Sequence, residues 1–248
     1  MEISQSTQSI YDNRPNKDIV EKKMMISGRR FLGYGTKRVN CLTVCCDRYK
    51  LHVDRLFKSF AKKVFIVERA DDKLKTINAA AKNCQFHKNG KVKIIPLDAD
   101  EFTLNDCQFM DLDIDGTLAT SGKTIRKHAL TQRNDNNHSR KIFSFAFSAR
   151  YKNELTFSEL HEIMRIFDVF LIGFDGVPGG FGKGKSVPKS INMSARSKNN
   201  PDGKLRYCKK LGADYNMLTK NVQIEEILFH KYNDGEGPMG HIVISYRT

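Results

Sequence analysis

A chain of 248 residues, of which 40% are hydrophobic and 28% are charged, has the composition of a globular protein that can bury a full core. No apolar run approaches the about 18 residues that a membrane-spanning helix needs, and the polar first residues lack the apolar core of a signal peptide, so we expect no membrane partner and no secretion. The formal net charge of +14 favours a polyanionic partner, nucleic acid before membrane, because the basic residues do not form one amphipathic helix.

The cysteines of the chain show neither a CxxC pair nor a second ligand group at zinc spacing. Most of them sit in or beside apolar runs, which is typical of small core residues in a reducing compartment. We therefore expect no disulfide, no structural metal and a cytoplasmic location. The six are Cys41, Cys45, Cys46, Cys84, Cys107 and Cys208.

The first half of the chain alternates between strand and helix patterns. Residues 1–25 are expected to form a flexible arm, followed by a basic, glycine-punctuated loop. Short apolar runs predict buried strands, and apolar residues at helical spacing predict the helices between them. The expected strands are Val39–Cys45, Val64–Val67, Val92–Leu97 and Phe109–Asp113, and the expected helices are His52–Phe60 and Asp71–Asn83.

The second half continues the pattern and ends in a hairpin. We expect helices over Ser121–Leu130 and Phe157–Phe167, a strand over Lys141–Ser148 with phenylalanines at every second position, a further apolar element over Val169–Ile172, and a β-hairpin made of Ile224–Tyr232 and His241–Tyr246. Alternating strands and helices predict an α/β fold with a mostly parallel sheet and right-handed crossovers, closed by an antiparallel edge. Residues 26–248 form one expected domain, with a basic, Gly/Lys-rich insertion at 173–215.

Three carboxylates alternate in the segment Phe109–Thr117, FMDLDIDGT, and a glycine follows them. Asp111, Asp113 and Asp115 would share one side of an extended segment, where they repel one another unless the chain turns or a cation approaches. We interpret this segment as the carboxyl end of a buried strand that opens onto a site, because ligands of open α/β sheets bind at such ends.

The order of elements over roughly residues 30–248 resembles class I S-adenosylmethionine-dependent methyltransferases. The resemblance implies a Rossmann-like three-layer sandwich with a seven-stranded sheet that ends in an antiparallel hairpin, and it implies S-adenosylmethionine as cofactor. It places a ribose-binding acid at the end of the second strand, where Glu68 in VFIVER stands. It places an adenine-binding acid after the third strand, where Asp98 in PLDADE stands with Asp100 as an alternate.

The fourth strand of that family ends in a motif that faces the methyl group and the acceptor. Here the motif corresponds to Asp113 with Asp115, either as the base that removes a proton or as an electrostatic partner of the sulfonium, and Asp111 is a further candidate for cofactor binding. The chain departs from the family in the turn after the first strand, which reads CCDRYKLHVD without glycine; Asp47 is the polar candidate there. It also lacks the NPPY-type motif of exocyclic-amine methylation, so no acceptor atom is inherited.

A run of basic residues follows the late strands and lies among glycines whose backbone amides suit phosphate binding. We expect a nucleic-acid-binding segment here, RNA or DNA, whose candidate residues are Lys183, Lys185, Lys189, Arg196 and Lys198. A protein that binds nucleic acid on this fold without catalysing methyl transfer is one alternative.

A second alternative uses the same acidic segment. DIDGTL, Asp113–Leu118, resembles the first motif of haloacid-dehalogenase-like phosphatases, in which the first Asp is the nucleophile, the second is the general acid/base and Mg²⁺ lies between them. That family carries the motif on its first strand, whereas three strand-like runs precede it here, and Asp175 is the only candidate for the downstream acidic pair.

Overall fold

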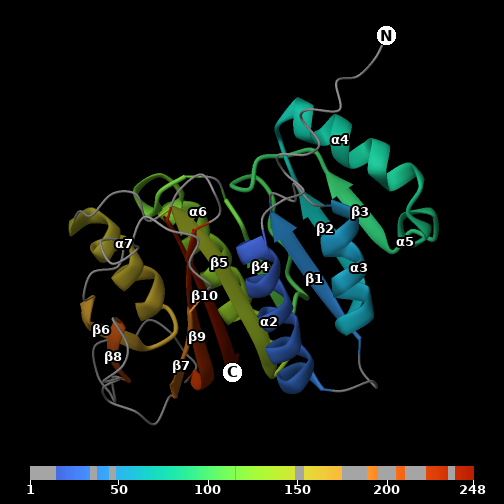
Figure 1. Cartoon of the computed structure of the whole chain (residues 1–248). Helices are drawn as coiled ribbons and strands as arrows, with labels where there is room; N and C mark the ends of the chain where they lie inside the picture. Colours follow the sequence, from blue (N-terminus) through green and yellow to red (C-terminus); the bar gives the residue numbers. More distant parts are fainter. Residues whose placement is uncertain are drawn as a thin grey trace.

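The computed structural model describes residues 15–33, 38–44, 49–114, 116–148, 154–174, 189–194, 205–209, 222–233 and 238–248. Figure 1 shows a twisted sheet with helices packed on both of its faces. None of the helices in these ranges is long and apolar enough to cross a membrane.

The sheet has eight strands within the described part of the chain, in the order β3-β2-β1-β4-β5-β10-β9-β7. The first five strands of the chain run parallel to one another, and β10 pairs antiparallel with both β5 and β9. The expected terminal hairpin is thereby confirmed. The strands are β1 (Val39–Val44), β2 (Ala61–Val67), β3 (Val92–Ile95), β4 (Phe109–Leu112), β5 (Arg140–Ser148), β7 (Lys189–Ser194), β9 (Gln223–Asn233) and β10 (Pro238–Arg247).

Two pairings go beyond the expected seven-stranded sheet. Strand β7 adds an antiparallel edge next to β9, and β6 (Val169–Phe174) pairs with β8 (Leu205–Lys209) in a separate two-stranded sheet. Strands β7 and β8 lie inside the predicted insertion at 173–215, so that insertion contains regular structure.

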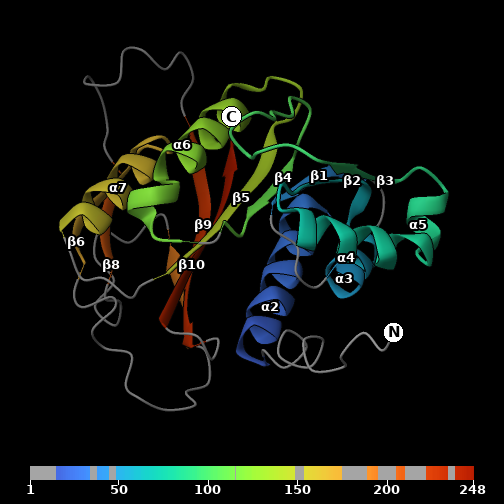
Figure 2. The ribbon, with the colours of Figure 1, turned by 90° about the horizontal axis from the view of Figure 1, so that it is seen from above.

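The helices form the two outer layers (Figure 2). Helices α2, α3 and α4 cover one face, where Met24, Leu56 and Ile77 join a core with Val64 and Phe109. Helices α6 and α7 cover the other face over the β5–β10–β9 half of the sheet. The bounds are α2 (Pro15–Leu32), α3 (Tyr49–Ser59), α4 (Asp71–Lys82), α5 (Gln85–Lys88), α6 (Leu118–Asn134) and α7 (Glu154–Arg165).

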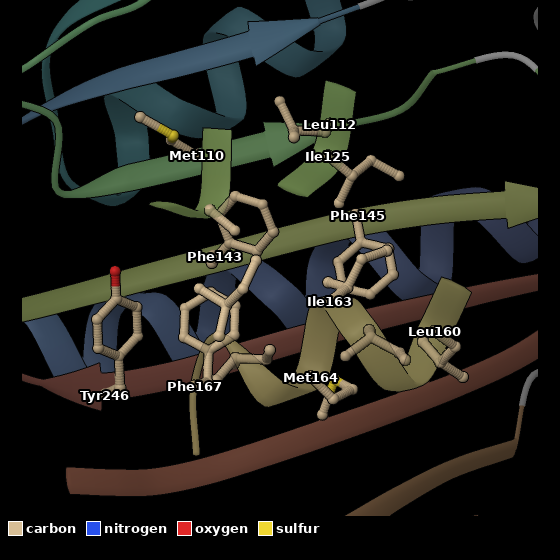
Figure 3. Packing of buried hydrophobic residues seen from close by; sticks show 14 of the residues in the cluster. Met110, Leu112, Ile125, Phe143, Phe145, Leu160, Ile163, Met164, Phe167 and Tyr246 are labelled. Atoms are coloured by element: carbon tan, nitrogen blue, oxygen red, sulfur yellow. The ribbon is translucent and has the colours of Figure 1, made fainter. Parts of the chain in front are cut away.

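The predicted phenylalanine strand anchors the core on the α6/α7 side (Figure 3). Phe143, Phe145 and Phe147 are fully buried on one face of β5, as their spacing predicts. The ring of Phe143 lies 5.4 Å from that of Phe167, measured between centroids, and α7 adds Ile163 to the same cluster. This packing fixes β5 beside β4 and so holds the carboxyl end of β4 in place.

The N-terminal segment differs from the expectation of an arm over residues 1–25. Residues 1–14 lie outside the described part of the chain, but from Pro15 the chain forms the 18-residue helix α2. Val20, Met24 and Met25 are buried against the sheet. Charged residues stand between and around these buried positions in the sequence, so a regular apolar stripe does not mark the helix.

The connection between β3 and β4 contains no helix. Residues 96–108 run through turns and bends, and Ala99 and Cys107 are its members in the core. As a result, the α6/α7 side of β2 and β3 has no helix over it (Figure 2).

Candidate functional site

The candidate site lies at the edge of the sheet where the parallel strands have their carboxyl ends. Glu68 follows β2, Asp98 follows β3 and Asp113 follows β4. Because β3, β2, β1 and β4 are parallel neighbours, the structure brings these three acids to one edge, as the sequence predicted.

Glu68 is held rigidly and keeps one acceptor unused. Its side-chain Oε1 accepts hydrogen bonds from the backbone amides of Arg69, at 3.0 Å, and Ala70, at 2.9 Å. The residue is only 9% exposed, and its Oε2 has no hydrogen-bond partner within the described residues. A buried carboxylate oxygen without a partner is costly, so this atom is suited to accept hydrogen bonds from a ligand.

Asp98 and Asp100, the two predicted acids after β3, interact with different partners. The guanidinium Nη1 of Arg69 lies 2.6 Å from Oδ2 of Asp98, on the exposed rim of the site. The carboxylate of Asp100 instead accepts a hydrogen bond of 2.5 Å from the hydroxyl of Thr124 on α6. Asp98 thus pairs with Arg69, the residue after Glu68, whereas Asp100 links the 96–108 connection to α6.

Asp113 forms an ion pair with Lys17 from the first turn of α2. Burial lowers the pKa of Lys17, but the charge and hydrogen bond of Asp113, together with Tyr232 and Glu21, outweigh it and raise that pKa well above its usual value. Burial raises the pKa of Asp113, an effect that the Lys17 ammonium only partly offsets. A helix that precedes the sheet in sequence therefore contributes a cation to the carboxyl end of β4.

Asp111 lies two residues earlier on the same side of β4, and it is buried under α2 and α3. Its Oδ1 accepts a 2.8 Å hydrogen bond from Ser144 on β5, the residue opposite it in the strand register. Nε2 of His241 on β10 lies 3.6 Å from Oδ1, and Nε2 of His52 on α3 lies 3.8 Å from Oδ2. Asp111 is close enough to Asp113 for its charge to raise the pKa of that carboxyl.

The charges of this cluster stabilise one another. Burial raises the pKa of Asp111, but the interactions with His241, with the charge of His52 and with the Ser144 hydroxyl lower it overall. Burial lowers the pKa of His52, but the nearby carboxylates of Glu21, at 4.0 Å, and Asp111 raise it overall. The structure thus favours an ionised Asp111 beside a protonated His52.

Sequence reasoning missed the basic side chains of this site, namely Lys17, His52 and His241. A single buried histidine on a helix or strand has no spacing signal. His241 lies on the same face of β10 as Val243 and Ser245, and all three are buried. The alternation in HIVISY therefore does not distinguish a site histidine from an ordinary core residue.

Several predicted site residues lie outside the described part of the chain. These are Asp47, Asp115, Lys183, Lys185, Arg196 and Lys198, while Lys189 begins β7 without a described side chain.

Comparison with models of protein families and with curated proteins found no match. Solved structures of similar architecture include a proposed RNA methyltransferase from Pyrococcus horikoshii, which is 8% identical at a TM-score of 0.45, with 92% of this chain and 81% of that chain covered. A precorrin-6y C5,15-methyltransferase from Geobacter metallireducens is 12% identical at a TM-score of 0.42, with coverage of 90% and 85%. Fibrillarin in its complex with Nop5p is 11% identical at a TM-score of 0.43, with coverage of 89% and 79%.

The fold is a Rossmann-like α/β fold whose sheet ends in an antiparallel hairpin, as the resemblance to class I methyltransferases predicts. The strand order with an antiparallel β10 between β5 and β9 is the feature of this chain that decides it. The DIDGT segment of this chain follows the fourth strand, whereas the phosphatase motif belongs on the first strand.

Proposed function

We propose that this chain is an S-adenosylmethionine-dependent methyltransferase that acts on nucleic acid. The observation that carries the proposal is Oε2 of Glu68, a buried acceptor without a partner among the described residues, at the carboxyl end of β2.

The residues at this edge fit the proposed cofactor. The two hydroxyls of a ribose need a fixed acceptor, and the backbone amides of Arg69 and Ala70 orient Glu68 for that role. Asp98 is the proposed partner of the adenine amine, with Asp100 as the alternate and Asp47 as the proposed contact from the turn after β1. Asp111 is engaged with Ser144, so its proposed contribution to the cofactor is electrostatic.

When it is bound, the cofactor supplies an electrophilic methyl group on a sulfonium. The chain would align the acceptor and, where the acceptor carries a proton, remove it. Asp113 is the proposed base, because its raised pKa brings the carboxyl closer to neutral pH, where a base works best. Lys17 would compete for that carboxylate until a substrate group replaces it. Asp115 is the second candidate.

The net charge of +14 supports nucleic acid as the substrate. The proposed contacts from the late segment are Lys183, Lys185, Lys189, Arg196 and Lys198.

A methyl-transfer assay tests the proposal. The protein is incubated with tritium-labelled S-adenosylmethionine and with total RNA or genomic DNA, and incorporation into each polymer is counted. Incorporation that is lost in Asp113→Asn but kept in Glu162→Gln, a control on α7, supports a methyltransferase. Salt-sensitive binding of the polymers without any incorporation would instead leave a binding protein on this fold and overturn the enzymatic proposal.

A further inference from the structure

The opposite end of the sheet, where β2 and β3 begin, carries lysines without acids. Residues 58–67 and 83–96 contain neither aspartate nor glutamate. The lysines of these two segments are all exposed: Lys58, Lys62, Lys63, Lys88, Lys91 and Lys93. We call three of them, Lys63, Lys91 and Lys93, the lysine face.

The fold brings the two segments side by side. Strands β2 and β3 pair in parallel, with Phe65 opposite Lys93. By alternation, Lys63, Lys91 and Lys93 lie on the same side of the sheet as Phe65. The rings of Phe57 and Phe86 stack at 4.1 Å between centroids, which joins the end of α3 to α5 and so brings the neighbouring lysines of these helices to the same end of the sheet.

This side of β2 and β3 is the one without a helix, because residues 96–108 form a loop and α6 and α7 lie over the other half of the sheet (Figure 2). Phe65 is only partly buried there, and the ammonium of Lys93 lies 5.9 Å from the centroid of its ring. None of Lys63, Lys91 and Lys93 has an acidic partner among the described residues.

We propose that the lysine face binds the phosphate backbone of single-stranded nucleic acid. This inference rests on the proposed function for the class of substrate and adds a second contact surface to it. Unpaired ammonium groups on a side of the sheet without a helix complement a polyanion, and the partly buried ring of Phe65 between them offers an edge to an unpaired base. From Lys63 to Glu68 the extended strand covers about 16 Å, so a bound strand can continue along β2 and β3 toward the candidate site.

A structural role explains only part of the lysine face. Lysine on an edge strand deters pairing between chains, and Lys93 on the edge strand β3 has the right position for this. Lys63 belongs to β2, which has strands on both sides, so protection of an edge does not account for it.

The test compares two triple variants of equal charge. Lys63→Gln/Lys91→Gln/Lys93→Gln neutralises the lysine face, and Lys22→Gln/Lys75→Gln/Lys123→Gln neutralises exposed lysines on three helices. Binding of a fluorescein-labelled 20-nucleotide RNA, and of the matching DNA, is followed by anisotropy over a range of KCl concentrations. Because each phosphate contact contributes about 0.7 to the slope of log K against log salt, loss of three contacts should reduce the slope by about 2 and weaken binding about tenfold or more at low salt.

Equal losses in both triple variants would show a diffuse charge effect and overturn the inference, as would an unchanged slope in the lysine-face variant. Binding of polyglutamate as tight as that of RNA would favour an acidic protein partner and also overturn it. S-adenosylmethionine binding is measured on the same preparations. If the lysine-face variant keeps cofactor binding and shows an unchanged salt dependence of RNA binding, the lysine face does not bind RNA, but the proposed function still stands.

Discussion

Replacement of Asp111 by asparagine should destabilise the protein in a manner that depends on pH. The substitution keeps the shape of the side chain and an acceptor for the Ser144 hydroxyl, but it removes the charge that faces His52 at 3.8 Å and His241 at 3.6 Å. Removing one partner of a buried ion pair costs about 3–5 kcal/mol. Since Glu21 remains near His52, we expect the lower end, about 3 kcal/mol, where His52 is protonated.

The signs of the two pKa shifts set the pH window. The pKa of His52 is raised above 6.5, so the stabilisation from its proton is complete below pH 6.5 and is lost as the pH rises through the folded-state pKa. The pKa of Asp111 is lowered below 3.8, so its stabilisation holds above pH 3.8 and is lost as the pH falls through the folded-state pKa. Both charges are therefore present at pH 5.5. Where the pH exceeds the folded-state pKa of His52, its neutral ring leaves mainly the difference between a charged and a neutral acceptor for Ser144, about 1 kcal/mol.

The chain has no tryptophan, so urea unfolding is followed by far-ultraviolet circular dichroism, for the wild type and for Asp111→Asn at pH 5.5 and pH 9. The difference in free energy of unfolding should shrink by about 2 kcal/mol between the two pH values. In a His52→Gln background the difference between the two pH values should be smaller, with His241 left as the imidazole that faces residue 111. A cost that is the same at both pH values in the wild-type background would refute the charged Asp111–His52 pair.

Three further substitutions probe the packing around the site. Lys17→Met keeps the alkyl chain but leaves Asp113 without its cation, and it should lower the free energy of unfolding by about 2–3 kcal/mol. In urea unfolding, the double variant Lys17→Met/Asp113→Asn should lose less than the sum of the two single losses. Strict additivity of the two losses would argue against the ion pair. Gly240→Ala would place a Cβ 2.5 Å from Cζ of the fully buried Phe147 and should cost about 1–3 kcal/mol in thermal unfolding. Gly122→Ala meets only the end of the Glu159 side chain inside α6 and should be neutral or stabilising, so a larger loss there than at Gly240 would contradict the packing described.

The sheet could be predicted from the sequence because its signals are local. The apolar run Val64–Val67 and the alternating phenylalanines of β5 mark buried strands by composition and period alone. Glu68 and Asp98 follow directly from the strands that they terminate, so the acidic edge was predictable too. The lengths of the elements were less predictable. Helix α6, for example, begins at Leu118, three residues earlier than its sequence pattern indicates.

The basic side chains of the site were not predictable, because their contacts are long-range. Lys17 meets Asp113 across 96 residues, and His241 meets Ser144 across 97. Nothing near Glu21 in sequence shows that its carboxylate is buried, where it pairs with Arg55 at 2.6 Å. Helix α2 carries Lys17 and Glu21 on its inner side, so a stripe of apolar residues alone does not describe its buried face.

Calorimetric titration with S-adenosylmethionine tests the central claim most directly. The wild type should bind at micromolar concentration, and Glu68→Ala should weaken binding about tenfold or more, the loss of one charge-assisted hydrogen bond. The control Glu162→Ala, on α7 and away from the strand ends, should bind as the wild type does. An absence of binding by the wild type at high protein concentration, or equal affinity in Glu68→Ala, would contradict the cofactor site at the end of β2.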